Sequence, residues 1–263
     1  SFKNKIEIDK AIDEIKSKKF KISDISSKVV NRNPSGPFTT STLQQVSSGK
    51  LGFGASRTMQ IAQKLYQGIE IEGETIGLIT YMRTDGTNLS TDAVSSFREY
   101  IKNEFGNEYL PNNPLNYSGK KAKNAQEAHE AIRPTDIMRT PIAVKKYLSL
   151  DQHKLYELIW SRALSSQMES AKFDRNTITI NSNDNSTICK ASGSVINFDG
   201  FLKIIKDNKK DDGDDILPEV KIGPINIESL LDEQHFTQPP PRYSEASLVK
   251  KLEELGIGRP STY

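Results

Sequence analysis

The chain has 263 residues, of which 36 are Lys or Arg and 34 are Asp or Glu, so its formal net charge is only +2. This balance excludes a uniformly basic nucleic-acid-binding chain, and any anion site must be a local arrangement of cations. Hydrophobic residues make up 35% and charged residues 27%, a low apolar share for a single compact core. We therefore expect two or three small domains in an open or elongated soluble protein.

The single cysteine, Cys189, excludes an internal disulfide framework and a cysteine-based zinc site. It favours a reducing compartment, so we expect a cytoplasmic protein in which Cys189 is a small, half-buried strand residue. No apolar stretch approaches the roughly 20 residues that cross a bilayer, and no signal peptide is evident. The chain starts without a methionine and stops just after a helix and a turn, which suggests a piece of a longer protein.

Residues 1–34 predict a short charged helix in DKAIDEIKSKK and a strand in FKISDISSKVV, and NRNPSGP then marks a domain junction. The next segment predicts two helices. Thr40 or Ser41 caps the first, which ends at Gly49, and Ser56 caps the second, which ends at Gly68. The apolar face of the second helix consists of Met59, Ala62, Leu65 and Tyr66.

A hairpin follows, with strands IEI and TIGLITYM around a Glu-Gly-Glu turn. Two short helices and a hairpin resemble a winged helix-turn-helix in outline, although such elements also occur in unrelated folds. A further helix begins after the cap Ser90, with Asp92 in its positive first turn. Its apolar face consists of Val94, Phe97, Tyr100, Ile101 and Phe105.

Residues 110–124 predict a loop, AQEAHEAIRP a short helix that ends before Pro134, and residues 149–168 a longer helix. From residue 173 the pattern changes to strands, in NTITIN, STICKAS, VINFDGFLKII and INIES, which predicts a mostly antiparallel sheet. DNKKDDGDD predicts a solvated acidic loop, and a last helix runs from Ser244 to Gly256. The fold class is therefore α+β with several domains.

The sequence does not contain complete motifs for common nucleotide-binding or metal-binding sites. In SSGKLGFG, Gln44 stands where a P-loop needs its first glycine and Leu51 follows the lysine, while GFGASR lacks the third glycine of a dinucleotide site. The three histidines, His129, His153 and His235, are not spaced as a metal cluster. We therefore assign no metal site to this chain.

The remaining candidate for a catalytic site is a tyrosine with cationic side chains near it in the sequence. In GLITYMRTDGTNLS, Tyr81 stands where an apolar run meets a turn, and a phenol with a pKa of about 10 needs nearby positive charge to act as a nucleophile. If the strand continues, Arg83 projects to the same side, and its planar guanidinium suits a phosphate. His129 and Arg133 share one face if their segment is helical. The set suits attack on a phosphodiester without nucleotide fuel, although most tyrosines near arginine are packing residues.

GLITYMRTDGTNLS resembles the active-site segment of type IA DNA topoisomerases, and methionine after the tyrosine is similar to the bacterial topoisomerase I branch. Three more segments agree in the same order, and the resemblance spans about Pro34 to Tyr263. These segments are PFTTSTLQQVSSGKLGFGASRTMQIAQKLY, AQEAHEAIRPTD and FTQPPPRYSEASLVKKLEELGIGRPSTY. The resemblance implies that Tyr81 cuts one DNA strand and holds its 5′ phosphate, that Arg83 positions this phosphate, and that His129 assists.

The resemblance also implies DNA-binding residues. Asp85 would organise the site, and Arg133 would contact a phosphate unless it serves only as an ion pair at the end of its helix. Arg259 and Thr262, in GRPST, would contact single-stranded DNA beside the cleavage site. Gly86 departs from the serine usual after the aspartate, which would loosen this turn.

The implied architecture is a toroid. A winged-helix-like (CAP-like) domain, 35–168, carries the tyrosine, residues 1–34 and 169–238 form a strand-rich arch, and 239–263 begin a helical domain that binds single-stranded DNA. The implied activity is ATP-independent relaxation of negatively supercoiled DNA by a monomer associated with the nucleoid. The family's Mg²⁺ site and general acid belong to an N-terminal domain absent here, so we expect this chain alone to be inactive.

Two alternatives stay open. A non-catalytic winged-helix DNA-binding module would use Tyr81 only to stack on bases. A tyrosine recombinase or type IB-like enzyme would need several arginines and a histidine around its tyrosine, a pattern that these motifs do not fit. The small net charge also predicts weak duplex binding, better single-strand binding and a shallow salt dependence.

Overall fold

The computed structural model describes residues 4–117, 130–205, 217–259 and 262. It is a mixed α/β fold with an antiparallel sheet, as the sequence predicts, and it divides into two compact units. The sheet unit comprises Ser1–Arg32, Ala171–Asp199 and Asp207–Pro240, and the tyrosine unit comprises Asn33–Ser170, Gly200–Lys206 and Pro241–Tyr263. The predicted assignment of domains to an arch and a single-strand-binding region stays a prediction.

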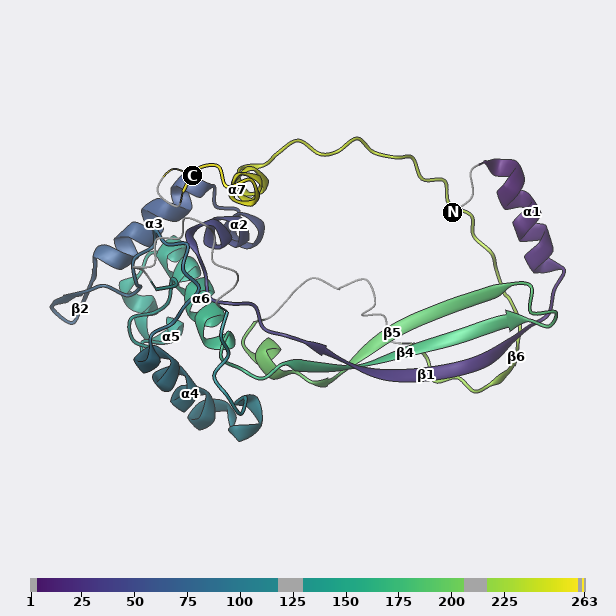
Figure 1. The fold of residues 1–263 in the computed structure, drawn as a ribbon, viewed down its shortest axis with the longest axis horizontal. Helices are drawn as coiled ribbons and strands as arrows, with labels where there is room; N and C mark the ends of the chain where they lie inside the picture. Colours follow the sequence, from purple (N-terminus) through teal and green to yellow (C-terminus); the bar gives the residue numbers. More distant parts are fainter. Residues whose placement is uncertain (1–3, 118–129, 206–216, 260–261, 263) are drawn as a thin grey trace. The chain divides into compact units, whose positions relative to one another are not determined.

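The sheet unit is built on four strands in the order β5-β4-β1-β6 (Figure 1). They are β1 (Phe20–Arg32), β4 (Ala171–Ser182), β5 (Ile188–Phe198) and β6 (Gly223–Ile225), and all neighbouring pairs are antiparallel. Strands β1 and β4 pair over nearly their whole length, with one irregularity between Ile22 and Asp24. The predicted strand VINFDGFLKII is wrong beyond Phe198, because Gly200 (φ 48°) turns the chain into the 3₁₀ helix η3 (Gly200–Lys203).

The other predictions in this unit hold in part. The first helix, α1, spans Lys5–Lys16 and so begins earlier than predicted, because Asn4 accepts a hydrogen bond from the Glu7 amide as its N-cap. Cys189 lies in β5 as predicted but is exposed rather than half-buried. The predicted acidic loop DNKKDDGDD lies outside the described residues. No helix in the described ranges has the length and apolarity needed to cross a membrane.

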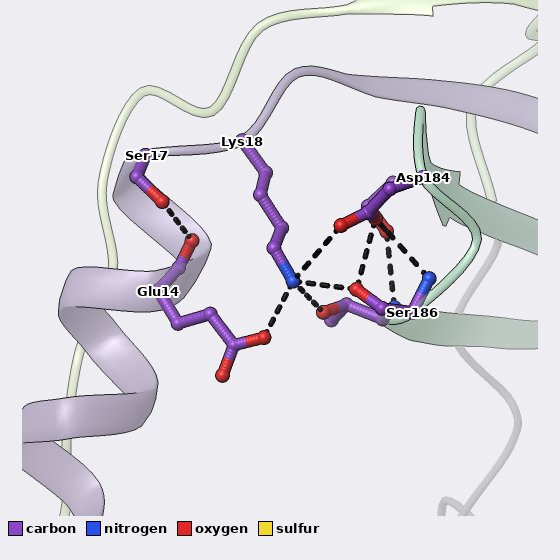
Figure 2. A network of polar contacts seen from close by, with 7 residues as sticks. Glu14, Ser17, Lys18, Asp184 and Ser186 are labelled. Carbon is purple, nitrogen blue, oxygen red and sulfur yellow. Dashed lines mark hydrogen bonds and ion pairs between the residues drawn. The ribbon is translucent and has the colours of Figure 1, made fainter.

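Hydrogen bonds and ion pairs link the end of α1 to the β4–β5 turn (Figure 2). The Lys18 ammonium donates to Glu14 and Ser186, both at 2.5 Å, and lies 3.4 Å from the Asp184 carboxylate. Asp184 accepts hydrogen bonds from the Ser182 hydroxyl at 2.5 Å and from the Ser186 amide at 3.1 Å. The Ser182 hydroxyl, the Ser186 donors and the charge of Lys18 together hold the pKa of Asp184 well below its usual range.

The tyrosine unit is mainly helical and packs around a buried apolar core. Its longer helices are α2 (Thr40–Leu51), α3 (Ala55–Gln67), α4 (Thr91–Phe105), α6 (Leu150–Ser165) and α7 (Glu245–Glu254). The short elements are the hairpin β2 (Ile69–Ile71) and β3 (Glu74–Ile76), the 3₁₀ helices η1 (Asn107–Tyr109) and η2 (Lys145–Tyr147), and α5 (Pro141–Val144). Large side chains less than 2% exposed include Leu43, Leu65, Ile101, Leu155 and Ile159.

Several helix ends differ from the sequence prediction. Helix α2 is capped by Thr39 in a reciprocal capping box with Thr42, and it ends at Gly52, whose φ of 68° favours glycine. Helix α3 starts after Gly54, which provides no side-chain cap, and it ends at Gly68 as predicted. The predicted caps and stop (Thr40, Ser41, Gly49 and Ser56) lie within the helices. On the predicted apolar face of α3, Tyr66 is 42% exposed, whereas Ala62 and Leu65 are buried.

Candidate functional site

The segment that carries Tyr81 leaves the hairpin before the tyrosine. Strand β3 ends at Ile76, so the prediction of a strand through Met82 is wrong. A Cβ on Gly77 would lie 2.6 Å from the carbonyl oxygen of Tyr66, so only glycine lets the chain pass the end of α3 here. The Leu78 amide then donates to the Leu65 carbonyl at 2.7 Å. The chain therefore reaches Tyr81 as an ordered loop anchored on α3.

The backbone just before Tyr81 is held by the segment 131–133. The Thr80 amide donates to the Arg133 carbonyl at 3.0 Å, and the Thr80 hydroxyl donates to the Ala131 carbonyl at 2.7 Å. The same hydroxyl accepts from the Arg133 amide at 3.0 Å. Thr80, the residue that precedes Tyr81, is thus fixed through both its amide and its hydroxyl.

The backbone just after Tyr81 is held by the first residue of α2. The Thr40 hydroxyl lies 2.8 Å from the Met82 carbonyl and 3.1 Å from the Thr84 carbonyl, to which it can donate, and it accepts from the Thr84 amide at 2.8 Å. The Thr40 amide also donates to the Thr84 carbonyl at 2.9 Å. Met82 and Thr84 are buried. Tyr81 therefore lies between two backbone anchor points, at Thr80 and at 82–84.

The side chains on this loop remain accessible. Tyr81 and Arg83 are both half-buried, and Asp85 is exposed. The Tyr81 ring packs edge-on against Tyr66, with centroids 5.4 Å apart and an interplanar angle of 66°. Because residues 81–83 are not in a strand, the expectation that Arg83 shares a strand face with Tyr81 does not hold. The amide of Gly86 donates to the Thr84 hydroxyl at 2.9 Å, so this turn is tied to the same buried threonine.

Arg133 lies in an extended segment rather than a helix. Ile132 bridges Phe38 and Pro134 bridges Ile79. The predicted helical run is therefore wrong for residues 130–133, because their backbone groups bond to other segments instead. The Arg133 guanidinium donates to Glu130 at 2.6 Å and to the Pro134 carbonyl at 3.0 Å. Its predicted partner His129 lies outside the described residues.

The ion pair between Arg133 and Glu130 is only partly open to solvent, with side chains 14% and 35% exposed. Burial raises the pKa of Glu130, but the hydrogen bond and charge of Arg133, together with hydrogen bonds from Ser90, outweigh it and leave this pKa below its usual value. A third guanidinium contact reaches the Ser90 hydroxyl at 3.5 Å. Arg133 can therefore meet a phosphate only by sharing its donors with, or releasing, these partners.

Helix α7, which precedes Arg259, packs against α2 (Figure 1). The first residue of α2 holds the loop that carries Tyr81, which we call the tyrosine loop. The Ser41 hydroxyl donates to Glu253 near the end of α7 at 2.5 Å, and Glu245 at its start accepts from the Ala55 amide at 2.7 Å. Ser41 follows Thr40, which holds the tyrosine loop. The end of α7 therefore lies at the same end of α2 as that loop.

The chain after α7 turns sharply at a glycine. The amides of Gly256 (φ 68°) and Ile257 donate back to the carbonyls of Glu253 and Leu252, which is a Schellman ending. Beyond it, the Arg259 amide donates to the Thr262 hydroxyl at 2.8 Å, and the Thr262 amide returns a bond of the same length to the Arg259 carbonyl. The side chain of Arg259 is exposed, so it is available to a ligand.

A cavity of about 370 Å³ opens beside the residues that follow the tyrosine loop. Its lining residues come from three separated segments: Thr87, Asn88, Leu89 and Val94, then Pro114, Leu115, Asn116 and Tyr117, and finally Gln167. The Tyr117 hydroxyl donates to the Ser166 carbonyl at 2.9 Å, and burial raises the pKa of Tyr117 to about 12. Sequence reasoning missed this cavity, and it also missed the anchoring threonines Thr40, Thr80 and Thr84.

The described residues do not provide a magnesium site. No three carboxylate, histidine or cysteine side chains within the described ranges gather as a metal cluster. Asp85 is a single carboxylate on an exposed loop, whereas Mg²⁺ prefers octahedral oxygen ligation, usually with more than one anionic ligand. The residues present therefore do not fit the ion that the resemblance implies.

The family model described as DNA topoisomerase matches residues 1–263, so the chain belongs to that family.

Among its relatives, DNA topoisomerase 1 of Rickettsia felis is 52% identical over 255 residues, covering 95% of this chain and 33% of the relative. DNA topoisomerase 1 of Xylella fastidiosa is 50% identical over 260 residues, covering 96% of this chain and 32% of the relative. The full-length topoisomerase I structure from Thermotoga maritima matches with a TM-score of 0.78 and 38% identity, covering 97% of this chain and 41% of that one. The chain thus spans about a third of the length of these curated relatives.

Proposed function

We propose that this chain supplies the DNA-cleaving tyrosine of a type IA topoisomerase, an isomerase of DNA, with Tyr81 as the nucleophile. The observation that carries the proposal is the double anchoring of the loop, with Thr80 fixed on one side of Tyr81 and Met82 and Thr84 fixed on the other. A nucleophile that must meet a phosphorus atom in line benefits from such fixation, because misplacement by about 1 Å can cost about a hundredfold in rate.

The chemistry is a transesterification. The Tyr81 phenolic oxygen attacks a backbone phosphorus, the new P–O(tyrosine) bond forms, and the bond to the 3′ oxygen of the preceding nucleotide breaks. The phenol loses its proton, and the leaving 3′ oxygen gains one to become a hydroxyl. The products are a 5′-phosphotyrosine and a free 3′ hydroxyl, which can attack the phosphotyrosine and reseal the strand. One phosphodiester replaces another, so no ATP is consumed.

The remaining predicted residues take supporting roles in this proposal. Arg83 and His129 stabilise the negative charge that develops on the phosphoryl oxygens, and Asp85 organises the loop. The partner of the Arg133 guanidinium changes from Glu130 to phosphate when DNA binds. Single-stranded DNA beside the cleavage site is bound by the exposed Arg259 and by Thr262. The packing of α7 on α2 supports this last role.

We further propose that the chain works as a segment of a longer, monomeric enzyme in the cytoplasm. Its tyrosine region, 35–168, forms a winged-helix-like domain of a toroid, with the sheet unit as its arch, and the enzyme relaxes negatively supercoiled DNA through a single-stranded segment. Mg²⁺ and the general acid reside in the N-terminal domain. The chain alone is inactive in relaxation, since it spans about a third of the length of its relatives.

A cleavage assay on the full-length protein that contains this chain tests the proposal. A single-stranded oligonucleotide labelled at its 3′ end becomes covalently attached to the protein, whereas the same oligonucleotide labelled at its 5′ end is released as a shorter fragment. Tyr81→Phe abolishes both signals. The matched control Tyr66→Phe removes the hydroxyl of the ring that packs against Tyr81, and it retains the adduct.

The non-catalytic alternative predicts a different pattern. A DNA-binding module gives no adduct with either label and retains most of its affinity in Tyr81→Phe, because a phenylalanine ring stacks on bases as well as tyrosine does. Adduct formation by Tyr81→Phe at the wild-type level would overturn the assignment of the nucleophile.

A further inference from the structure

The strand register divides the long sheet into two faces of different character. Directly opposed residues point to the same face, and neighbours along a strand alternate. One face, which we call the cationic face, carries Lys28 of β1 opposite Arg175 of β4, and Arg175 in turn opposite Ser194 of β5. The other face carries Ile25 opposite Ile178, and Ile178 opposite Ala191. The two faces therefore present different chemistry to any partner.

The charges of β1, β4 and β5 are unevenly divided between these faces. The cationic face carries five basic residues (Lys21, Lys28, Arg32, Arg175 and Lys190) and one acidic residue, Asp24. The opposite face carries Lys172 and Asp174, whose charges cancel. A chain of net charge +2 thus concentrates positive charge on one side of its sheet.

The centre of the cationic face holds two like charges side by side. Lys28 and Arg175 are directly opposed across β1 and β4, and both are exposed. Cβ atoms of such pairs lie about 5 Å apart, and like charges there are destabilising. Neither Lys28 nor Arg175 forms an ion pair with a carboxylate of the described residues. Together they fit an anion with several oxygens.

Hydroxyl groups surround this cation pair on the same face. Ser26, Thr177 and Ser192 form the adjacent cross-strand row, and Ser194 lies opposite Arg175. The hydroxyls of Thr177 and Ser192 are 3.4 Å apart. Serine and threonine hydroxyls, with arginine and lysine, are the side chains that commonly bond phosphate oxygens in DNA complexes. The patch therefore combines charge with neutral donors.

We propose that the cationic face, centred on Lys28 and Arg175, binds the sugar–phosphate backbone of duplex DNA, an inference that rests on the proposed action on DNA. From Lys21 to Lys28 the strand covers about 20 Å, which corresponds to about six phosphates of one duplex strand. Single-strand binders add aromatic platforms for base stacking. The sole aromatic side chain on this face of β1, β4 and β5 is the half-buried Phe173, so backbone contact to a duplex fits better.

The salt dependence of binding tests this surface. The 263-residue chain carrying Lys28→Gln and Arg175→Gln is compared with wild type by fluorescence anisotropy, using a 20-base-pair duplex and its single strand. The loss of two phosphate contacts should make the plot of log binding constant against log salt concentration less steep by about 1.8 on the duplex. The matched control, Lys10→Gln with Lys172→Gln, removes the same charge from α1 and from the opposite face, and it changes the slope by less than half as much.

A charge-preserving variant separates binding from folding. Lys28→Arg with Arg175→Lys retains the wild-type slope, and melting curves of all variants confirm that the sheet is intact. Equal slope changes in the test and control pairs, or none in either, would overturn the proposal. A larger change on single strands than on the duplex would overturn the choice of occupant.

The cleavage assay keeps this inference separate from the proposed function. If the wild-type enzyme forms the tyrosine adduct but the slopes coincide, the surface is wrong and the function stands. If no adduct forms but the slopes differ as predicted, the surface stands and the function is wrong.

Discussion

The tyrosine unit and the sheet unit are stabilised in different ways. In the described residues of the sheet unit, the buried apolar side chains are Phe20, Ile22, Ala171 and Ile178, and the long strands leave much of their surface exposed. The tyrosine unit instead buries a continuous helical core that includes Leu43, Leu155 and Ile159. The sheet therefore depends mainly on backbone pairing, and the tyrosine unit on side-chain packing.

This difference suits the two roles that we propose. A reacting oxygen needs a fixed position, which a packed unit provides through buried anchors such as Thr40 and Thr84. A surface that contacts a regular phosphate backbone needs exposed side chains at regular spacing. A sheet provides them when one of its faces is open to solvent.

The largest effect should come from the helical core. Leu155→Ala, at a side chain with no exposed surface, is expected to lower the free energy of unfolding by about 2–5 kcal/mol, because the cavity is lined by rigid neighbours. Ile196→Ala in β5, where the side chain is 54% exposed, should cost less than about 1 kcal/mol. Urea unfolding of both variants measures the difference. Equal costs would contradict the contrast between the units.

The next effect concerns the anchor of the tyrosine loop. Thr40→Val removes the hydroxyl that bonds to residues 82 and 84, and it should cost about 1–3 kcal/mol because it leaves buried backbone groups unpaired. The rate of adduct formation by the full-length enzyme should also fall, by tenfold or more. Thr58→Val is the matched control, since its buried hydroxyl bonds to Ser47 rather than to the loop.

The control should lose stability without a comparable loss of cleavage rate. Equal rates in the two variants would show that the Thr40 anchor does not position Tyr81.

A smaller effect concerns pH and the exposed β4–β5 turn. The pKa of Asp184 is lowered from its ordinary value of 3.8. A depressed pKa contributes stability that is fully present above the unfolded value and is lost as the pH falls through the folded value. The difference in unfolding free energy between wild type and Asp184→Asn should therefore be constant above about pH 5 and shrink below pH 3.8. A difference that widens as the pH falls would refute the assigned direction.

The smallest expected effect is a gain in folding stability rather than a loss. Arg175→Gln removes a like-charge neighbour of Lys28 and should stabilise the chain by about 0.2–1 kcal/mol at low salt. The gain should vanish at high salt, where exposed charges are screened. Chemical denaturation at two salt concentrations measures it. A loss of stability would show that Arg175 has a structural role rather than a role reserved for a ligand.

Local patterns in the sequence predicted most of the elements. The cap at Ser90, the stop at Gly68 and the strand from Phe20 followed from side-chain chemistry and periodicity, and the structure contains all three. The path through Tyr81 did not follow, because β3 ends where Gly77 passes the Tyr66 carbonyl, a contact between segments. The same holds for Arg133, whose segment bonds to Thr80 and Phe38 instead of forming a helix.

The site was predictable only in its residue types. Tyr81 and Arg83 could be singled out by spacing and by resemblance, but Thr40 could not, because its role depends on a hydroxyl that bonds to a segment 42 residues away. The cationic face was hidden for a similar reason. The net charge of +2 indicated weak duplex binding, and only the register of β1 with β4 places Lys28 opposite Arg175.

The most direct test of the central claim is to locate the DNA on the protein. The full-length enzyme is allowed to cleave an oligonucleotide, the covalent adduct is trapped by denaturation, and the DNA is digested to a short remnant. Peptide mass spectrometry should then find a nucleotide phosphate on the tyrosine of the peptide that contains Tyr81. A remnant on Tyr66 or on any other residue, with Tyr81 unmodified, would contradict the account.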